Sequence, residues 1–213
     1  MGFSLPLVYP ILDSSFLPVV GRSEFLDRLG RSMADAGVRL MEYRNKPGTD
    51  AEVLADARTL RAAMPAATLV MDDRVDVALA ANFDGVHVDG GDLPVGDARR
   101  LLGLNGKGIV GTSAGSEAQL AEALKSRADY IAFGPVYPTT TKQTSAPPIG
   151  WVGVQRFREL AGPDAVLVAA AGITLETAPA ILEAGANAVA VAAAIFGHDD
   201  PAAEFRRWMA ALG

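Results

Sequence analysis

The chain has 213 residues, half of them hydrophobic, and no long polar linker divides it, so we expect one domain spanning residues 1–213 with one sizeable core. Its net charge of -6 argues against a general nucleic-acid binder, and its lack of Cys excludes disulfides, thiolate catalysis and sulfur-ligated metals. The apolar runs are too short to span a membrane and the first residues carry no basic segment, which predicts a soluble cytoplasmic protein without a membrane partner.

Short apolar runs alternate with amphipathic stretches of helical period along the whole chain. The apolar runs predict strands at residues 7–12, 38–43, 68–71, 85–88, 108–111, 130–133, 166–170 and 188–192. The intervening stretches predict helices at about 23–36, 50–64, 74–81, 94–102, 116–126, 151–161, 174–184 and 200–211. This β-then-α order, with runs buried on both faces and without a G-x-G-x-x-G or Walker loop, predicts an α/β fold: a single (β/α)8 TIM barrel rather than an open doubly wound sheet.

Polar residues follow the predicted strands at the ends where a barrel of this kind carries its chemistry. In chain order they are Glu42, Tyr43, Arg44, Asn45 and Lys46 after the second strand, Asp72, Asp73 and Arg74 after the third, residues 89–92 after the fourth, Thr112 and Ser113 after the fifth, and residues 134–142 after the sixth. Any one of these residues could be a solvated loop residue or a helix cap. Their repetition at the same end of successive strands predicts a shared site instead.

Residues 134–142, Gly-Pro-Val-Tyr-Pro-Thr-Thr-Thr-Lys, have a composition suited to phosphate binding. The hydroxyls of Thr139, Thr140 and Thr141 donate directionally to phosphate oxygens, and Lys142 adds a positive charge. The alternative is an ordinary surface connection rich in turn residues.

Small residues follow the last two predicted strands, namely Gly172 after the seventh and Ala192 and Ala193 after the eighth. In a barrel, small residues at these positions let backbone N–H groups approach an anion closely. Tight packing between the barrel and its helices is the competing explanation.

Asp73 and Asp92 follow neighbouring strands, so their carboxylates could converge on one hard cation. Mg2+ suits this arrangement because it accepts a few carboxylates, keeps several waters and takes further oxygen ligands from a substrate diphosphate. Asp72 and Asp92 could instead cap the helices that begin near residues 74 and 94.

Three cations, Arg44, Lys46 and Lys142, could surround such a diphosphate, with Arg able to bind two oxygens at once. Ordinary surface ion pairs are the alternative. The two histidines receive no chemical role: His87 lies inside the fourth predicted strand as a satisfied core or rim imidazole, and His198 lies in an exposed turn.

The chain resembles the thiamine phosphate synthase family, within the group that also contains the thiazole tautomerases. The similarity covers residues 7–195 and rests on YRNK at 43–46, DRVDVALA at 73–80, DGVHV and DLP within 84–94, GTS at 111–113, GPVYPTTTK at 134–142 and AGI at 171–173. The resemblance implies a Mg2+-dependent transferase that condenses hydroxymethylpyrimidine diphosphate with a thiazole phosphate, giving thiamine phosphate and diphosphate.

The resemblance also implies roles for individual residues. The catalytic residues that hold the diphosphate end are Arg44, Lys46, Ser113 and Lys142, and the Mg2+ ligands are Asp73 and Asp92. The thiazole phosphate lies against Thr139, Thr141, Gly172 and the amides of Ala192 and Ala193. The remaining expected substrate-binding residues are Glu42, Tyr43, Asn45, Asp72 and Thr140.

The chain departs from the family pattern at Glu42, Asp72 and Ala193, where the family usually has Gln, Asn and Ser, and at Asp89-Gly90, where it usually has Gly-Gln. The added carboxylates should repel a diphosphate in a desolvated site unless a metal or a proton compensates. A working synthase, a paralogue acting on another phosphorylated heterocycle and a binding protein without the reaction all stay open, as does assembly of several copies. A tautomerase would lack its acid–base group, because Ala114-Gly115 stands where those relatives carry a His.

Overall fold

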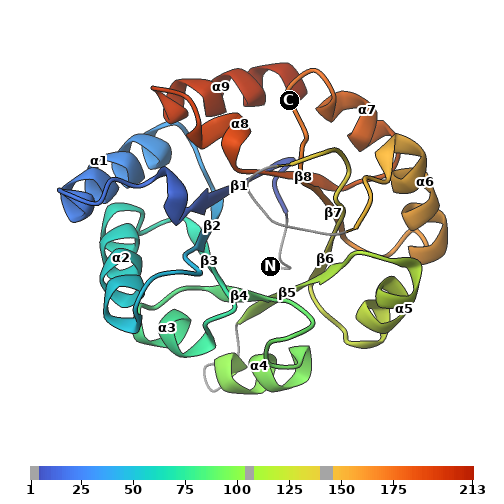
Figure 1. Cartoon of the computed structure of the whole chain (residues 1–213), viewed down its shortest axis with the longest axis horizontal. Coiled ribbons are helices and arrows are strands. Elements are labelled where there is room, and N and C mark those ends of the chain that lie inside the picture. Colours follow the sequence, from blue (N-terminus) through green and yellow to red (C-terminus); the bar gives the residue numbers. More distant parts are fainter. Residues whose placement is uncertain (1–4, 104–107, 140–145) are drawn as a thin grey trace.

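The computed structural model describes residues 5–103, 108–139 and 146–213. The strands within these ranges are β1 (Val8–Asp13), β2 (Leu40–Arg44), β3 (Thr68–Asp72), β4 (Gly85–Val88), β5 (Ile109–Ala114), β6 (Tyr130–Phe133), β7 (Leu167–Ala170) and β8 (Ala188–Val191). Each strand pairs in parallel with its neighbours in the sequence, and β1 also pairs with β8, for example Val8 with Val189, which closes the barrel (Figure 1). The predicted (β/α)8 TIM barrel is therefore confirmed.

The helices lie outside the barrel and cover its strands (Figure 1). They are α1 (Arg22–Asp35), α2 (Asp50–Ala63), α3 (Val75–Ala80), α4 (Val95–Leu102), α5 (Glu117–Lys125), α6 (Gly150–Ala161), α7 (Ala178–Glu183), α8 (Ala193–Phe196) and α9 (Pro201–Leu212), with a 3-10 turn η1 (Ser14–Phe16) after β1. Local sequence explains several starts: Thr49 and Glu52 form a capping box ahead of α2, Ser116 caps α5, and Asp200 caps α9. Within the described ranges, no helix combines the length and apolarity needed to cross a bilayer.

The predicted strands coincide with β4 and β6 and differ most from the structure at β5. A strand predicted to end at residue 111 continues through Thr112 and Ser113 to Ala114. The strand continues because Thr112 is β-branched, which favours extended backbone, and because its hydroxyl donates to the Val88 carbonyl of β4 at 2.9 Å. Thr112 and Ser113 therefore belong to the barrel wall rather than to the loop that follows it.

The helix predicted at 174–184 is shorter in the structure, and α8 has no counterpart among the predicted helices. The residues ahead of α7 form a turn in which the Thr174 N–H donates to Thr177 Oγ1 at 2.9 Å, so α7 begins only at Ala178. The short α8 follows β8 almost directly, and an apolar Ala-rich run of this length does not distinguish the end of a strand from a helical turn.

Two apolar layers hold the barrel together. The outer layer lies between the strands and the helices and includes Leu26, Phe157 and Trp208. The inner layer fills the barrel and consists of Tyr9, Leu40, Tyr130, Val168, Ala188 and Ala190. Gly111 makes room for this layer, because a Cβ at that position would lie 2.1 Å from the Tyr130 ring. Most of these inner residues stand early in their strands, so the inward positions further along each strand remain available for a site.

Candidate active site

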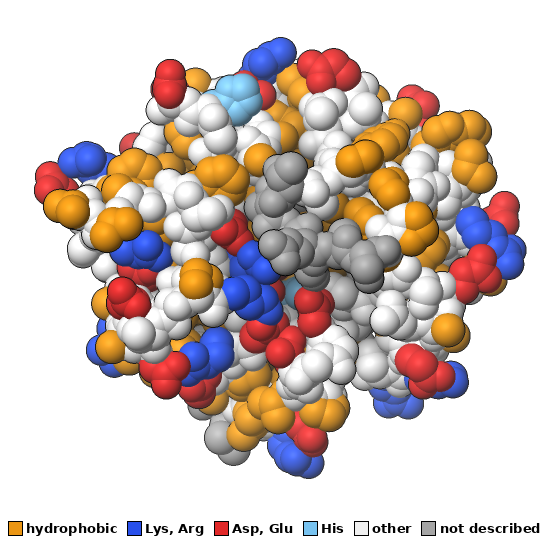
Figure 2. All heavy atoms as spheres, viewed as in Figure 1, with side chains coloured by type: hydrophobic (Ala, Val, Ile, Leu, Met, Phe, Trp, Pro, Cys, Tyr) orange, Lys and Arg blue, Asp and Glu red, His pale blue; other side chains and the backbone are white. Residues whose placement is uncertain are grey.

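A cavity of about 600 Å³ opens where the carboxyl ends of the strands meet. The residues of the predicted site that line it are Glu42, Arg44, Asp72, Ser113, Thr139, Gly172, Ala192 and Ala193. A second hollow of about 900 Å³ adjoins it, shares Ser113 and Thr139, and extends past Asp92 toward α5. Figure 2 shows acidic and basic side chains gathered near the centre of this face. The structure thus brings these residues together from separate strands.

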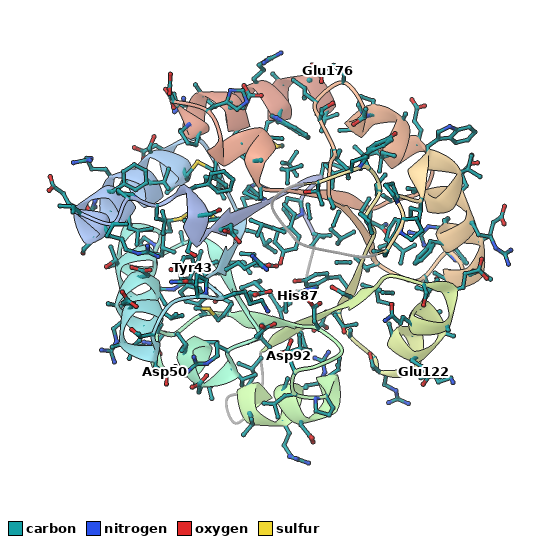
Figure 3. The ribbon with its side chains drawn as sticks, in the orientation of Figure 1. Tyr43, Asp50, His87, Asp92, Glu122 and Glu176 are labelled. Carbon is teal, nitrogen blue, oxygen red and sulfur yellow. The ribbon has the colours of Figure 1, made fainter. Side chains whose placement is uncertain are left out.

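Alternation along β2 decides which of its residues face the cavity. Glu42 and Arg44 point inward and line it, whereas Tyr43 between them is fully buried and points outward, toward α2 (Figure 3). Asn45 lies with Tyr43 and donates to its hydroxyl at 3.1 Å. Neither Tyr43 nor Asn45 is among the described residues that line the cavity, although both are predicted substrate-binding residues. Tyr43 is excluded because successive residues of a strand face opposite ways, and Asn45 is held beside it by this hydrogen bond.

Carboxylates hold the two cations of the predicted site that the structure describes. Arg44 donates through Nη1 to Asp13, and its Nε lies 3.7 Å from Asp72 Oδ2. Lys46 Nζ lies 3.0 Å from the same Asp72 oxygen and also contacts Asp73. These ion pairs orient both cations at the rim of the cavity. A ligand with the charge of a diphosphate would compete with the carboxylates for both of them.

A chain of hydrogen bonds crosses the floor of the cavity. Tyr9 donates to Glu42 Oε2 at 2.7 Å, and the hydroxyls of Tyr9 and Tyr130 lie 2.6 Å apart. The Tyr130 hydroxyl lies 3.2 Å from His87 Nδ1, and Ser113 Oγ lies 2.8 Å from His87 Nε2. His87 stands near the centre of the barrel in Figure 3. Buried polar groups therefore connect Glu42 with Ser113 across the barrel.

Burial is the largest single influence on the pKa values of Glu42 and His87 in this hydrogen-bonded network. It raises the pKa of Glu42 from 4.5 to about 7, while the charge of His87 lowers this pKa and the charge of Asp72 raises it. For His87, burial by itself lowers the pKa, but the hydrogen bond with Asp89 and the charge of Glu42 outweigh burial, and the net pKa is raised. The Glu42 carboxyl consequently carries a proton for a substantial part of the time at neutral pH.

Asp73 and Asp92 lie just beyond β3 and β4. The Asp73 N–H donates to the His87 carbonyl of β4 at 2.8 Å, which ties the two strand ends together, and Asp92 Oδ2 accepts from the Asp89 N–H at 2.8 Å. Neither α3 nor α4 has a side-chain hydrogen bond at its N-cap. The alternative in which Asp72 and Asp92 cap these helices is therefore wrong.

The Asp73 carboxylate fits a hard cation that takes its other ligands from outside the protein. Asp73 Oδ1 is buried and has no hydrogen-bond partner in the described part of the chain, so a cation would satisfy it. Across the described ranges, no group of three or more His, Cys, Asp and Glu residues is arranged to hold a metal. Mg2+ does not need such a group, because one or two carboxylates suffice when substrate phosphates and waters supply the remaining oxygens.

Gly172 lies where the loop after β7 passes the loop after β6. Its φ is 69°, and a Cβ there would lie 2.5 Å from the Pro138 carbonyl oxygen, so close backbone packing requires glycine at this position. Both explanations from the sequence, tight packing and room for an anion, are compatible with this geometry. Thr140, Thr141 and Lys142, which complete the predicted phosphate loop, lie outside the described residues.

Sequence reasoning assigned no role to Tyr9, Asp13, His87 and Tyr130, although the first three line the cavity and Tyr130 joins Tyr9 to His87. A usable signal exists for β1, because Tyr9 and Asp13 share the inward face of this strand at a spacing of four residues. For Tyr130 and His87, only the three-dimensional contact reveals the connection.

A closed parallel barrel with a polar cavity at the carboxyl ends of its strands defines the class, an α/β-barrel enzyme. Residues 8–195 match the family described as thiamine monophosphate synthase, and the chain belongs to this family.

Relatives of known name agree with this assignment. The thiamine-phosphate synthase of Koribacter versatilis is 38% identical over 193 residues, covering 90% of each chain, and that of Methanoculleus marisnigri is 35% identical over 208 residues, covering 97% of this chain and 93% of the relative. A solved structure, thiamine phosphate pyrophosphorylase from Pyrococcus furiosus, superposes with a TM-score of 0.81 at 28% identity, covering 96% of this chain and 94% of the other. A 3-hexulose-6-phosphate synthase, with a TM-score of 0.75, 21% identity and coverage of 98% and 100%, shares the fold.

Proposed function

We propose that this protein is a transferase that condenses hydroxymethylpyrimidine diphosphate with a thiazole phosphate, giving thiamine phosphate and diphosphate. The proposal rests on one observation: Arg44, Asp72 and Ser113 line one cavity, and Lys46 pairs with Asp72 at its rim. The chain that carries this cavity belongs to the thiamine monophosphate synthase family. A cavity of about 600 Å³ has the size expected of a small-molecule site.

The two phosphorylated ends of the substrates would bind to different parts of the cavity. Arg44 and Lys46 would hold the diphosphate, since a guanidinium binds two oxygens at once and an ammonium adds a point charge. Ser113 would donate its hydroxyl to the same group. The thiazole phosphate would lie beside Gly172 and the residues that follow β8, Ala192 and Ala193, where small side chains let backbone N–H groups approach.

The proposed reaction breaks the C–O bond between the pyrimidine methylene and the diphosphate, which departs with the electron pair. The lone pair of the thiazole nitrogen then forms the new C–N bond, so the protein needs no nucleophile of its own. Arg44 and Lys46 would stabilise the charge that grows on the departing diphosphate. The buried floor of Tyr9, Tyr130 and His87 would keep water from the electron-poor methylene carbon. Mg2+ held by Asp73 and Asp92 would supply further positive charge to the diphosphate.

Protonation of Glu42 would relieve the repulsion that an extra carboxylate creates beside a diphosphate. With a pKa of about 7, the Glu42 carboxyl can be neutral when the anion binds. Asp72 differs from Glu42 because Lys46 and Arg44 balance its charge before a ligand binds.

The proposal is tested by incubating the purified protein with Mg2+ and both substrates and measuring thiamine phosphate by chromatography. Product should form only when both substrates are present, and free diphosphate should appear in equal amount. If saturating substrates and Mg2+ give no thiamine phosphate, the proposed function is wrong.

A further inference from the structure

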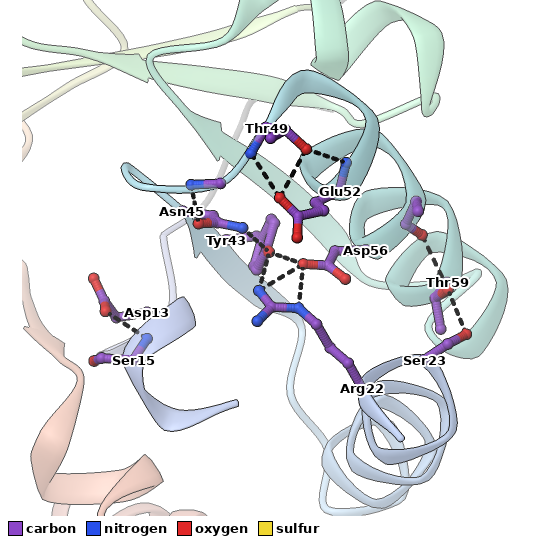
Figure 4. Close-up of polar contacts among 12 residues, drawn as sticks. Asp13, Ser15, Arg22, Ser23, Tyr43, Asn45, Thr49, Glu52, Asp56 and Thr59 are labelled. Atoms are coloured by element: carbon purple, nitrogen blue, oxygen red, sulfur yellow. Dashed lines mark hydrogen bonds and ion pairs between the residues drawn. The ribbon is translucent and has the colours of Figure 1, made fainter. Parts of the chain in front are cut away.

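Tyr43, Asp56 and Arg22 form a polar cluster on the outer side of the barrel wall, between β2, α2 and α1 (Figure 4). The Tyr43 hydroxyl donates to Asp56, and Arg22 Nε donates to the same carboxylate oxygen at 2.8 Å. Arg22 Nη2 also lies 3.3 Å from the Tyr43 hydroxyl. Tyr43 and Asp56 are both buried, so their hydrogen bond forms away from water, where such bonds are strong, while the Arg22 side chain is 25% exposed. We call these three residues the Tyr43 cluster.

The Tyr43 cluster continues into the loop between β2 and α2. Asn45 Nδ2 donates to the Tyr43 hydroxyl at 3.1 Å, and Asn45 Oδ1 accepts from the Gly48 N–H at 3.0 Å. The loop then ends in the capping box of Thr49 and Glu52 at the start of α2 (Figure 4). The loop is therefore fixed to Tyr43 at one end and to α2 at the other.

Lys46 belongs to this loop but reaches the opposite side of the barrel wall. Its ammonium lies 3.0 Å from Asp72 Oδ2 at the rim of the cavity and also contacts Asp73. A Lys side chain is long and flexible, so the position of its backbone determines which points the ammonium can reach. One short loop thus joins the Tyr43 cluster outside the barrel to a cation at the cavity.

We infer that the Tyr43 cluster positions Lys46 to bind the diphosphate group of the substrate, an inference that rests on the proposed function. Tyr43 and Asn45 are then positioning residues, which act on the substrate through Lys46 and not by contact. The competing explanation is that the cluster only fastens α1 and α2 to the barrel. In that case its removal lowers the stability of the protein and leaves its affinity for diphosphate unchanged.

The decisive variant is Tyr43→Phe, which removes one hydroxyl and keeps the buried ring. The probe is inorganic diphosphate with Mg2+, titrated into the full chain by calorimetry. We expect the Kd to rise about threefold to tenfold, the effect of one ordering hydrogen bond. The KM for the pyrimidine diphosphate should rise and kcat should fall, because Lys46 acts on both the bound and the departing diphosphate, while the KM for the thiazole phosphate changes by less than about twofold. An unchanged Kd in a folded Tyr43→Phe protein overturns the inference.

A double-mutant cycle shows whether the effect passes through Lys46. In a Lys46→Met protein, adding Tyr43→Phe should weaken diphosphate binding no further, because the residue being positioned is already gone. An undiminished additional loss in this background contradicts the inference.

Two more variants guard against a purely structural effect. Asp129→Asn is the matched control. Asp129 directly precedes β6, at the end of the barrel opposite to Tyr43, and accepts from Arg99 and from the Val110 N–H of β5. The substitution should lower the free energy of unfolding without changing the Kd for diphosphate. If Tyr43→Phe does not fold, Asn45→Ala breaks the link between Tyr43 and the Gly48 N–H in the loop itself and should give the same rise in Kd; no rise overturns the inference.

The titration separates this inference from the proposed function. Wild-type protein that binds diphosphate but makes no thiamine phosphate counts against the proposed function alone, because the Kd does not depend on turnover. Wild-type protein that does not bind diphosphate with Mg2+ overturns the inference.

Discussion

Replacing Glu42 with Gln should stabilise the protein increasingly as the pH rises. Glu42 is 4% exposed, and burial raises its pKa from the ordinary 4.5 to about 7. The folded state therefore binds the proton more tightly than the unfolded state does. The resulting stabilisation is fully present below about pH 4.5 and is lost as the pH rises through about 7, since ionisation then favours the unfolded chain.

The size of the effect follows from the two pKa values. One pKa unit corresponds to about 1.4 kcal/mol, so a rise from 4.5 to about 7 amounts to about 3 kcal/mol for a fully buried carboxyl. Gln has nearly the same shape, its carbonyl can accept the hydrogen bond from Tyr9, and it does not ionise. The free energy of unfolding of Glu42→Gln, relative to wild type, should thus increase by about 3 kcal/mol between pH 4.5 and pH 8.

Urea unfolding of both proteins across this pH range, followed by circular dichroism, measures the difference. Glu159→Gln on α6 is the matched control, because the Glu159 side chain is 70% exposed and should show no more than about 0.5 kcal/mol of change with pH. A stability difference between Glu42→Gln and wild type that does not vary with pH would refute the reasoning. It would mean that the fold holds Glu42 ionised and compensates its charge.

Three further substitutions test other parts of the site. Arg44→Ala should lower kcat/KM on the order of 10²-fold, the usual effect of removing one preorganised donor to a developing charge, while Arg156→Ala, at an exposed ion pair on α6, should retain wild-type kinetics. Asp73→Asn should raise the Mg2+ concentration that supports half-maximal diphosphate binding by about tenfold or more, measured by calorimetry at varied Mg2+, since a neutral amide is a weaker ligand; an unchanged Mg2+ requirement would exclude Asp73 as a ligand. Gly172→Ala should lower the free energy of unfolding by about 1–3 kcal/mol through backbone strain, and the close contact with the Pro138 carbonyl should lower it further. Gly162→Ala is the control, because Gly162 has a positive φ but open space around it, and this variant should lose less stability in the same denaturant titration.

The barrel could be predicted from the sequence because a strand of a closed parallel barrel is buried on both faces and so reads as a short apolar run. This signal gives β4 and β6 at their observed ends. It fails at the end of β5, because Thr112 and Ser113 are polar residues that loops also favour, and only the pairing of these residues with β4 and β6 shows that the ladder continues.

The inward polar positions near strand ends could be predicted in part. Arg44, Asp72 and Ser113 line the cavity, as predicted for polar residues at the carboxyl ends of barrel strands. Tyr43 shows the limit of this reasoning, because a motif read as a contiguous segment does not separate the inward from the outward residues of a strand.

Long-range contacts lay beyond the sequence. Tyr9 and Tyr130 are 121 residues apart, and their hydroxyls meet only because Gly111 leaves space for the Tyr130 ring inside the barrel. The high pKa of Glu42 depends on this same buried floor, so the protonation state of the site could not be predicted before its partners were known.

The diphosphate of the substrate is expected to bind in the cavity at the carboxyl ends of the strands. A crystal structure of the protein with inorganic diphosphate and Mg2+ tests this binding site. Diphosphate oxygens should lie within hydrogen-bonding distance of Arg44 and Lys46, with Mg2+ bound to Asp73. Diphosphate bound elsewhere, with Arg44 still paired to Asp13 and Asp72, would contradict this expectation.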